Sequence, residues 1–281
     1  MKNAILFGFG NIGKVLAEQI PKEKIDLKYI VNSKGVFDSS LSKQGDLSDW
    51  KIFANDIGIV FITIPTVSDG AKALEYASFF LEKDIPVVTC EKASIANHFE
   101  YFKKHENIFK FTASVGGGTK MLERLSKFDG EVFEIKGIVN GTLNFIGDSL
   151  KKGINKNEIV KEILEKGFAE PGANTFEEII EGELNDIRLK TVILANSSGM
   201  FEKIIGPQDI KIARKDLAKR CIVKISKEKI EAGFLEDNDA EWLPDGVNNV
   251  LYINTKKVCF GPGAGAVATV ESMLGDLKSL I

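Results

Sequence analysis

Short apolar runs alternate with amphipathic segments along the N-terminal part of the chain. Five apolar runs are typical of buried strands: residues 4–7, 27–31, 57–64, 85–89 and 108–111. Apolar residues recur at helical spacing from Ile12 to Ile20, and Pro21 then ends the predicted helix. A second helix is predicted over residues 68–82. Strands that alternate with helices in this way indicate βαβ units and a parallel sheet.

The pattern changes after about residue 125, where helices are grouped against strands. Further strands are predicted at residues 132–139, 221–225, 229–234, 250–253 and 258–260, with a hairpin turn at 254–257. Helices are predicted at residues 157–166, 177–196 and 266–281. This grouping favours an α+β arrangement for the second part of the chain.

The 281 residues suit two domains, because single domains contain about 100–200 residues. We therefore predict an α/β protein with a Rossmann-type parallel sheet in a dinucleotide-binding domain at residues 1–125. An α+β domain is predicted at residues 126–262.

Composition and charge exclude several classes of function. Hydrophobic residues make up 44% of the chain, and the formal net charge of -3 gives no electrostatic support for binding nucleic acid. No apolar run approaches the ~18–20 residues of a membrane span, and the N-terminus has no signal-peptide pattern. Three widely spaced cysteines and no pairing pattern predict a reducing compartment, the cytoplasm. The two histidines lie far from any cysteine cluster, so no zinc site is expected.

Residues 8–13 read G-x-G-x-x-G between the first predicted strand and helix, which is where a dinucleotide-binding turn belongs. Gly8 permits the tight turn, Gly10 lets a pyrophosphate approach the backbone, and Gly13 allows close packing of the helix. Asn11 and Ile12 open the helix, whose free N–H groups face the phosphates. A glycine turn without a ligand is the alternative.

The end of the second predicted strand indicates which dinucleotide binds. An NAD enzyme usually has Asp or Glu there for the ribose 2′-hydroxyl. This chain has no carboxylate there, but it offers Ser33 as a hydrogen-bond donor and Lys34 as a positive charge. This favours NADP over NAD. A solvated loop lysine is the alternative for Lys34.

Loops at the carboxyl ends of parallel strands line the ligand crevice. Ile64 and Pro65 follow the third predicted strand, and Lys92 follows the fourth. We therefore predict that Ile64 and Pro65 contact the cofactor. Lys92 is predicted to lie where nicotinamide and substrate meet, with a surface lysine as the alternative.

Three charged residues in the second part of the chain are candidates for chemistry. Glu170 lies in a loop between Gly167 and Pro171. Asp186 and Lys190 are four residues apart on a predicted helix, so they share one face beside its apolar stripe. From the residues alone an exposed surface ion pair is favoured, with a partly buried pair beside the apolar stripe as the alternative.

Five segments in order along the chain resemble the homoserine dehydrogenase family. They read A-S-V-G-G-G at 113–118, G-I-V-N-G-T-L-N-F-I at 137–146, G-F-A-E-P at 167–171, D-I-R-L-K at 186–190 and G-P-G-A-G at 261–265. The resemblance covers nearly the whole chain. It implies an NAD(P)-dependent oxidoreductase that interconverts L-homoserine and L-aspartate 4-semialdehyde in threonine and methionine biosynthesis.

The resemblance also implies a role for each matching residue. Lys190 would be the catalytic lysine that polarises the reacting oxygen and handles its proton, and Lys92 would be its partner near the nicotinamide. Glu170, Asp186 and Thr142 would hold the substrate. The 261–265 segment, with Gly265 near the cofactor, would bring the helix in residues 263–281 back onto the nucleotide domain.

The resemblance has further implications for assembly and regulation. The second domain would form a homodimer. Because the chain ends at Ile281, we expect a short form without a C-terminal regulatory domain and without threonine feedback through one.

Three departures from the family pattern concern ions and contacts. The family holds a monovalent cation through backbone oxygens near Val115 and Gly117, and Thr112 replaces the usual acidic residue before them. Thr119 and Lys120 replace an apolar residue and proline, and Leu184 replaces a glycine. A further acidic contact is left open among three candidates: Glu177, Glu178 and Glu181.

Two other functions remain as alternatives at this stage. One is a related amino-acid dehydrogenase, such as an aspartate dehydrogenase, against which the set of Lys92, Glu170, Asp186 and Lys190 argues. The other is a catalytically impaired protein that binds NADP without turnover.

Overall fold

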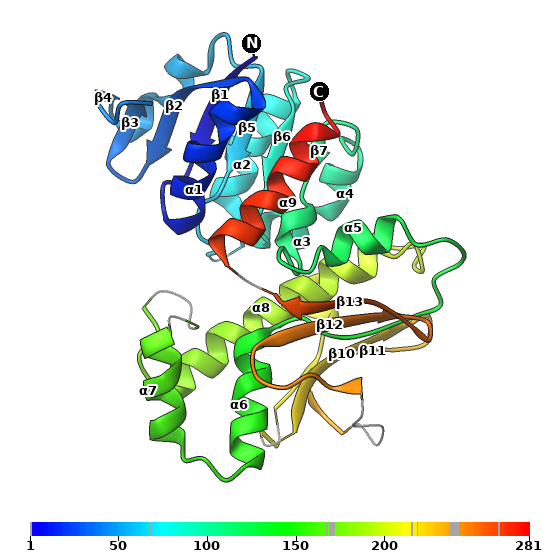
Figure 1. Ribbon diagram of the computed structural model, residues 1–281. Helices are drawn as coiled ribbons and strands as arrows, with labels where there is room; N and C mark the ends of the chain where they lie inside the picture. Colours follow the sequence, from blue (N-terminus) through cyan, green and yellow to red (C-terminus); the bar gives the residue numbers. More distant parts are fainter. Residues whose placement is uncertain are drawn as a thin grey trace. The chain divides into compact units, whose positions relative to one another are not determined.

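The chain forms two compact units, Met1–Gly117 with Gly265–Ile281, and Gly118–Ala264. The computed structural model describes residues 2–67, 69–166, 168, 172–214, 216–217, 219–236, 242–263 and 265–281 (Figure 1). Each unit has its own sheet, so each is described by itself. The mixed α/β fold with a parallel Rossmann-type sheet and a second sheet confirms the predicted fold class.

The first unit has a seven-stranded sheet in the order β4-β3-β2-β1-β5-β6-β7. Its strands are β1 (Lys2–Phe7), β2 (Ile25–Asn32), β3 (Gly35–Asp38), β4 (Lys43–Gly45), β5 (Ile59–Ile62), β6 (Val87–Thr89) and β7 (Phe109–Lys110). The strands from β2 to β7 in this order are parallel, so their carboxyl ends form one edge.

Helices cover both faces of the parallel sheet in the first unit. They are α1 (Asn11–Gln19), α2 (Ala71–Leu81), α3 (Ala93–Asn97), α4 (Phe99–Lys103) and α9 (Ala266–Lys278), with 3-10 turns at Ile20–Glu23, Leu47–Ala54 and Thr112–Ser114. The last helix, α9, packs beside α1, although most of the chain separates them in sequence (Figure 1).

The alternation of side chains along β1 explains why helices cover both of its faces. Ala4 and Leu6 belong to a buried apolar cluster that includes Met273 of α9. Phe7 points to the opposite face, where its ring stacks on Tyr76 of α2 at 4.0 Å between centroids. Full burial of a large apolar side chain contributes about 1.5–3 kcal/mol, so the two layers stabilise the sheet from both sides.

The sequence pattern did not predict β3 and β4, which pair antiparallel at the edge of the first sheet. The chain turns back through the two residues Ser33 and Lys34, and Gly35 has φ +134°. Both strands are short, and β4 is polar, so neither carries the apolar run that marks a buried strand.

The second unit has a six-stranded sheet in the order β13-β12-β8-β10-β11-β9. Its strands are β8 (Glu134–Ile138), β9 (Ile212–Ala213), β10 (Arg220–Ser226), β11 (Ile230–Leu235), β12 (Asn248–Ile253) and β13 (Lys256–Pro262). Its helices are α5 (Met121–Ser126), α6 (Gly141–Lys151), α7 (Lys156–Lys166) and α8 (Phe176–Ser197), with a 3-10 turn at Pro207–Asp209. The predicted hairpin between β12 and β13 is confirmed, but its turn is only Asn254 and Thr255, because β13 begins at Lys256.

Helix α6 begins where the sequence analysis predicted only the end of a strand. Asn140 caps it, because its side chain accepts a hydrogen bond from the Leu143 N–H at 2.8 Å. The segment then has apolar residues at helical spacing, namely Leu143, Ile146 and Leu150. The polar residues and the glycine between them weakened this signal in the sequence. Helix α5, within the predicted first domain, contacts α8 and β13 of the second unit.

Candidate active site

The glycine turn after β1 has the geometry of a dinucleotide-binding turn. Gly8 has φ +99°, and a Cβ there would lie 2.6 Å from the carbonyl carbon of Thr63, so no larger residue fits. The Gly8 N–H donates to the Val31 carbonyl at 2.8 Å, and the Thr63 hydroxyl donates to the Gly8 carbonyl at 3.0 Å. These bonds fix the turn between β2 and β5.

The start of α1 leaves room for a phosphate. A Cβ on Gly13 would lie 2.3 Å from the Gly8 carbonyl oxygen, whereas a Cβ on Gly10 would meet nothing within 4 Å. Gly10 is the N-cap and offers no side chain to the first helical amides, which include those of Asn11 and Ile12. The turn therefore fits the pyrophosphate of a dinucleotide.

Ser33 and Lys34 form the exposed turn that follows β2. The Asn32 side-chain oxygen accepts a hydrogen bond from the Lys34 N–H at 2.8 Å, which shapes the turn. Like the sequence, the structure places no carboxylate of this segment at the end of β2. This end of the sheet is where a Rossmann-type domain holds the adenosine ribose.

The loops after β5 and β6 lie against each other at the carboxyl edge of the sheet. Ile64 and Pro65 follow β5, and the Thr66 hydroxyl accepts a hydrogen bond from the Lys92 N–H at 3.3 Å. Lys92 is half-buried at the start of α3. The structure thus brings the predicted cofactor loops and Lys92 together within the first unit.

Sequence reasoning missed the residue that fixes the turn carrying Lys92. The Glu91 carboxylate is 1% exposed and accepts hydrogen bonds from the Ala93 N–H at 2.7 Å and the Ser94 N–H at 2.9 Å. The Ser94 hydroxyl donates to it at 2.6 Å. An acidic residue immediately before a helix was the available signal. Burial raises the pKa of the neighbouring Cys90 thiol to about 12, which disfavours the nucleophilic thiolate form.

In the second unit, Lys190 is held by two contacts. Its Nζ lies 2.6 Å from Asp186 Oδ2 and donates to the Val139 carbonyl at 2.9 Å. The two side chains are only 14% and 6% exposed, so the exposed surface ion pair favoured from the residues alone is wrong. Among the described residues these contacts use two of the three ammonium N–H groups.

Asn140 joins Asp186 to a second carboxylate that sequence reasoning missed. Asn140 Nδ2 donates to Asp186 Oδ2 at 2.9 Å and to Glu183 Oε2 at 2.5 Å. Asn140 and Glu183 are each 4% exposed. The signal was the spacing, because Glu183, Asp186 and Lys190 are three and four residues apart and share one face of α8.

The three acidic candidates named earlier for a further contact lie elsewhere. Glu178 forms the capping box of α8 with Thr175. Glu177 and Glu181 are 79% and 67% exposed and pair with Lys156 and Arg214. Within the described part of α8, Glu183 reaches the Asp186 cluster instead, so that prediction is corrected.

Thr142 lies in the first turn of α6, where it is 8% exposed. Its hydroxyl donates to the Phe168 carbonyl at 2.8 Å, which ties α6 to Phe168. Glu170 itself lies outside the described residues. Gly265, the last predicted cofactor contact, is the exposed N-cap of α9 with φ +131°.

The segment near Val115 and Gly117 is bound by side chains of α9. Asp276 accepts hydrogen bonds from the Thr112 N–H at 2.8 Å and the Thr112 hydroxyl at 2.7 Å. The Ser272 hydroxyl donates to the Gly117 carbonyl at 2.5 Å. Among the described residues, no group of three or more His, Cys, Asp or Glu side chains is arranged to hold a metal ion.

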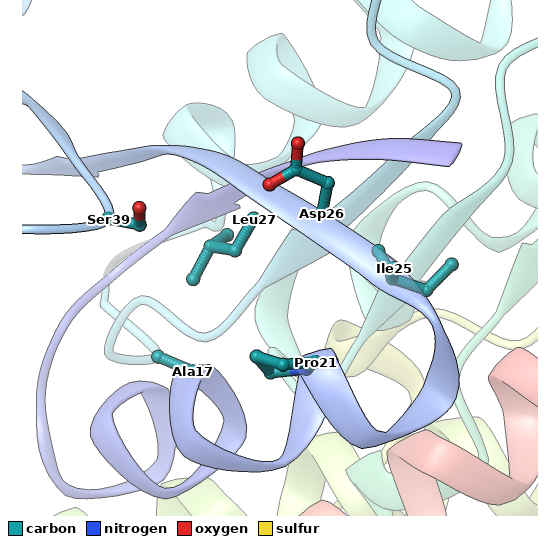
Figure 2. Close-up of a pocket in the computed structure, with 6 residues that line it drawn as sticks. All are labelled: Ala17, Pro21, Ile25, Asp26, Leu27 and Ser39. Atoms are coloured by element: carbon teal, nitrogen blue, oxygen red, sulfur yellow. The ribbon is translucent and has the colours of Figure 1, made fainter. Parts of the chain in front are cut away.

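A shallow surface pocket of the first unit lies away from these residues. Figure 2 shows Ala17 and Pro21 facing the first residues of β2, from Ile25 to Leu27, with Ser39 alongside. The first residues of β2 are at the amino end of the parallel sheet, opposite the glycine turn. Ligands of such sheets bind at the carboxyl ends, so we do not assign this pocket to the active site.

The fold and these residues define a class of protein, a two-unit dinucleotide-binding α/β oxidoreductase. The first unit has the glycine turn and Lys92 at the carboxyl edge of a parallel sheet. The second unit has a largely buried lysine paired with a carboxylate, which is suited to handling a proton. No helix in the described parts of the chain has the length and apolar character needed to cross a membrane.

Comparison with known proteins identifies the family. The homoserine dehydrogenase family profile matches residues 119–277. A homoserine dehydrogenase from Sulfurisphaera tokodaii is 28% identical, with 97% of this chain and 96% of that protein covered. One from Methanocaldococcus jannaschii is 32% identical over 74% of this chain and 67% of that protein. The chain belongs to the homoserine dehydrogenase family.

Solved structures agree with this fold. A putative homoserine dehydrogenase from Archaeoglobus fulgidus has a TM-score of 0.80 at 20% identity and covers 99% of this chain and 98% of its own. A hyperthermophilic archaeal homoserine dehydrogenase in complex with NADPH has a TM-score of 0.77 at 21% identity, covering 100% and 98%. At these identities the likeness concerns the fold.

Proposed function

We propose that the chain catalyses the NADP-dependent interconversion of L-homoserine and L-aspartate 4-semialdehyde. The observation that carries this proposal is the Lys190 ammonium, held in a buried site by Asp186 and the Val139 carbonyl. These contacts engage two of its three donors, and we propose that the third binds a substrate oxygen. Family membership favours this reaction over that of an aspartate dehydrogenase.

The chemistry requires a fixed cation beside the reacting oxygen. When bound, the cofactor supplies or accepts the hydride, and the protein supplies orientation and electrostatics. As the aldehyde is reduced, negative charge develops on its oxygen, and the Lys190 ammonium stabilises that charge and donates the proton. In the oxidative direction the Lys190 side chain receives the hydroxyl proton. Asp186 keeps the Lys190 side chain oriented in both directions.

The other predicted residues complete the proposed site. Lys92 would lie near the nicotinamide, and Glu170 would bind the substrate ammonium. Thr142 would contact substrate while its hydroxyl holds the Phe168 carbonyl. We further propose that the first unit is the dinucleotide-binding domain, with Gly265 near the cofactor, and that the second is the substrate-binding and dimerisation domain.

A single assay separates the candidate functions. NADPH formation is followed at alkaline pH with NADP and L-homoserine, and L-aspartate replaces homoserine in a parallel reaction. We expect turnover with homoserine and none with aspartate. Turnover with aspartate alone would identify an aspartate dehydrogenase. NADP binding without any turnover would identify a nucleotide-binding protein with impaired catalysis.

We propose NADP as the preferred cofactor, supported by the missing carboxylate at the end of β2 and by the exposed Ser33 and Lys34. Replacing Lys34 by alanine is expected to raise the KM for NADP roughly fivefold, because an exposed charge contact contributes up to about 1 kcal/mol. The KM for NAD should not change, since NAD lacks the 2′-phosphate. Steady-state kinetics with both cofactors checks this, and an equal rise for both would contradict the assignment.

No reaction step is assigned to a monovalent cation, because α9 already holds the 112–117 segment and takes one of the two acceptor positions of the Gly117 carbonyl. That carbonyl accepts the Ser272 hydroxyl, and Thr112 is bound to Asp276. We expect the melting temperature to be the same in sodium, potassium and choline chloride at equal ionic strength. A melting temperature that rises saturably with sodium or potassium alone, measured by calorimetry, would show that the protein binds the cation.

We propose a homodimer formed through the second unit. Phe260 on the edge strand β13 is 60% exposed beside the buried Val250 of β12. Phe260→Asp is expected to give a monomer in sedimentation velocity, because a charge at an apolar contact must be desolvated. Ile52→Asp in the first unit, where Ile52 is 69% exposed, is the matched control and should leave the dimer intact.

The three cysteines are free, which fits our proposal of a cytoplasmic location.

A further inference from the structure

We propose that Glu183 is a positioning residue that sets Lys190 through Asn140 and Asp186. This inference rests on the proposed function, since it takes Lys190 as the group that handles the proton. In this proposal Glu183 affects Lys190 indirectly. It acts by fixing the amide that both carboxylates share.

The Asn140 amide is fixed by three hydrogen bonds in three directions. One N–H donates to Glu183 and the other to Asp186, while its oxygen accepts from the Leu143 N–H. Turning the amide by half a rotation would place its oxygen against the two carboxylates and its NH2 group against the Leu143 N–H. Both contacts would then be unfavourable, so only one orientation satisfies every group.

Glu183 is the residue of this arrangement that fixes the orientation of the Asn140 amide. Without its carboxylate, a buried N–H of Asn140 loses its acceptor, which costs free energy. The amide is then drawn away from Asp186, whose Oδ2 also binds Lys190. Because Asp186 Oδ2 carries both bonds, a shift of Asn140 passes directly to the ammonium.

The buried surroundings of Glu183 are consistent with a positioning role. Burial, and then the negative charge of Glu183, raise the pKa of the Cys221 thiol on β10. Glu183 itself is a residue of α8 with 4% of its surface exposed. The substrate is expected at the remaining donor of Lys190. Glu183 is therefore proposed to act through Asn140 and Asp186 and not by contacting the substrate.

Two conservative substitutions separate the effect of the hydrogen bond from the effect of the charge. Glu183→Gln keeps the length and an acceptor oxygen, so the bond from Asn140 persists. Glu183→Asp keeps the charge but is one methylene shorter, so the bond is lost. We expect Glu183→Asp to lower kcat for homoserine oxidation by about tenfold to a hundredfold, as small misplacements of reacting groups do. The KM for homoserine and the Kd for NADPH should stay unchanged. Glu183→Gln should retain most of the wild-type kcat.

Glu181→Asp and Glu181→Gln are matched controls on the same helix. Glu181 is 67% exposed and pairs with Arg214, so neither change should alter kcat. The inference is overturned if Glu183→Gln is the inactive variant and Glu183→Asp the active one, because charge would then matter more than the bond. It is also overturned if the homoserine KM rises at constant kcat, since that result would make Glu183 a substrate ligand.

Failure of the proposed function is distinguishable from failure of this inference. Wild-type protein that does not oxidise homoserine contradicts the function alone. A thermal-unfolding cycle over Glu183→Asp and Asn140→Ser then tests the inference without activity. The double variant should lose less melting temperature than the sum of the single variants, because both remove the same bond. Additive losses would show that Glu183 and Asn140 are not coupled.

Discussion

Replacing Lys190 by alanine is expected to lower kcat for homoserine oxidation by about a hundredfold to ten-thousandfold, the range that a positioned acid or base contributes. The ammonium that stabilises the developing oxyanion and moves the proton is then missing. The Kd for NADPH, measured by fluorescence titration, should stay nearly unchanged. A large loss of cofactor affinity would contradict the role assigned to Lys190.

Stability must be followed in the same experiment. Removing one partner of a buried ion pair costs about 3–5 kcal/mol, so Lys190→Ala should also lower the melting temperature. Lys190→Arg keeps a cation beside Asp186 but changes the shape of the donor. It should therefore recover stability without recovering kcat. Lys161→Ala on α7, where the side chain is 75% exposed, is the surface control and should change neither quantity.

Substituting the glycines of the turn after β1 is expected to separate folding from cofactor binding. Gly13→Ala places a Cβ 2.3 Å from the Gly8 carbonyl oxygen, so it should destabilise the protein by about 1–3 kcal/mol, as overpacking does. Gly10→Ala meets nothing within 4 Å and should leave the melting temperature unchanged. It should still weaken NADPH binding at least tenfold, about 1.4 kcal/mol, because the pyrophosphate approaches this backbone.

Calorimetry and NADPH titration on both glycine variants check this pair of results. The two measurements should rank the variants in opposite ways: Gly13→Ala has the larger loss of stability, and Gly10→Ala keeps its stability while losing affinity. Unchanged affinity in Gly10→Ala would mean that the dinucleotide does not lie over the turn.

The strongest elements of the fold were predictable from residue patterns. The structure contains the strands predicted from apolar runs, β1, β2, β5 and β6, and the helices predicted from helical spacing, α1 and α8. These patterns are reliable because they reflect which side chains are buried. The shared helix face of Asp186 and Lys190 was likewise predictable from a spacing of four residues. The roles of Lys92, Glu170 and Thr142 came from the family resemblance and stay predictions.

Other features depend on contacts that no local pattern reports. The strands β3 and β4 pair only because Ser33 and Lys34 turn the chain back along β2. The contact between Glu183 and Asn140 joins residues far apart in sequence, so the local sequence around one does not predict its contact with the other. The bonds from Ser272 and Asp276 of α9 to residues 112–117 are similarly remote.

The position of α9 has a consequence for synthesis on the ribosome. Val270, Met273 and Leu277 of α9 belong to the same buried cluster as Leu6 of the first strand. The N-terminal sheet therefore cannot bury that face until the last helix has emerged, after residues 118–264 have been translated. At about 5–20 residues per second, this delay lasts on the order of ten seconds. During that time the nascent first unit exposes an apolar surface, which makes it a natural client for chaperones.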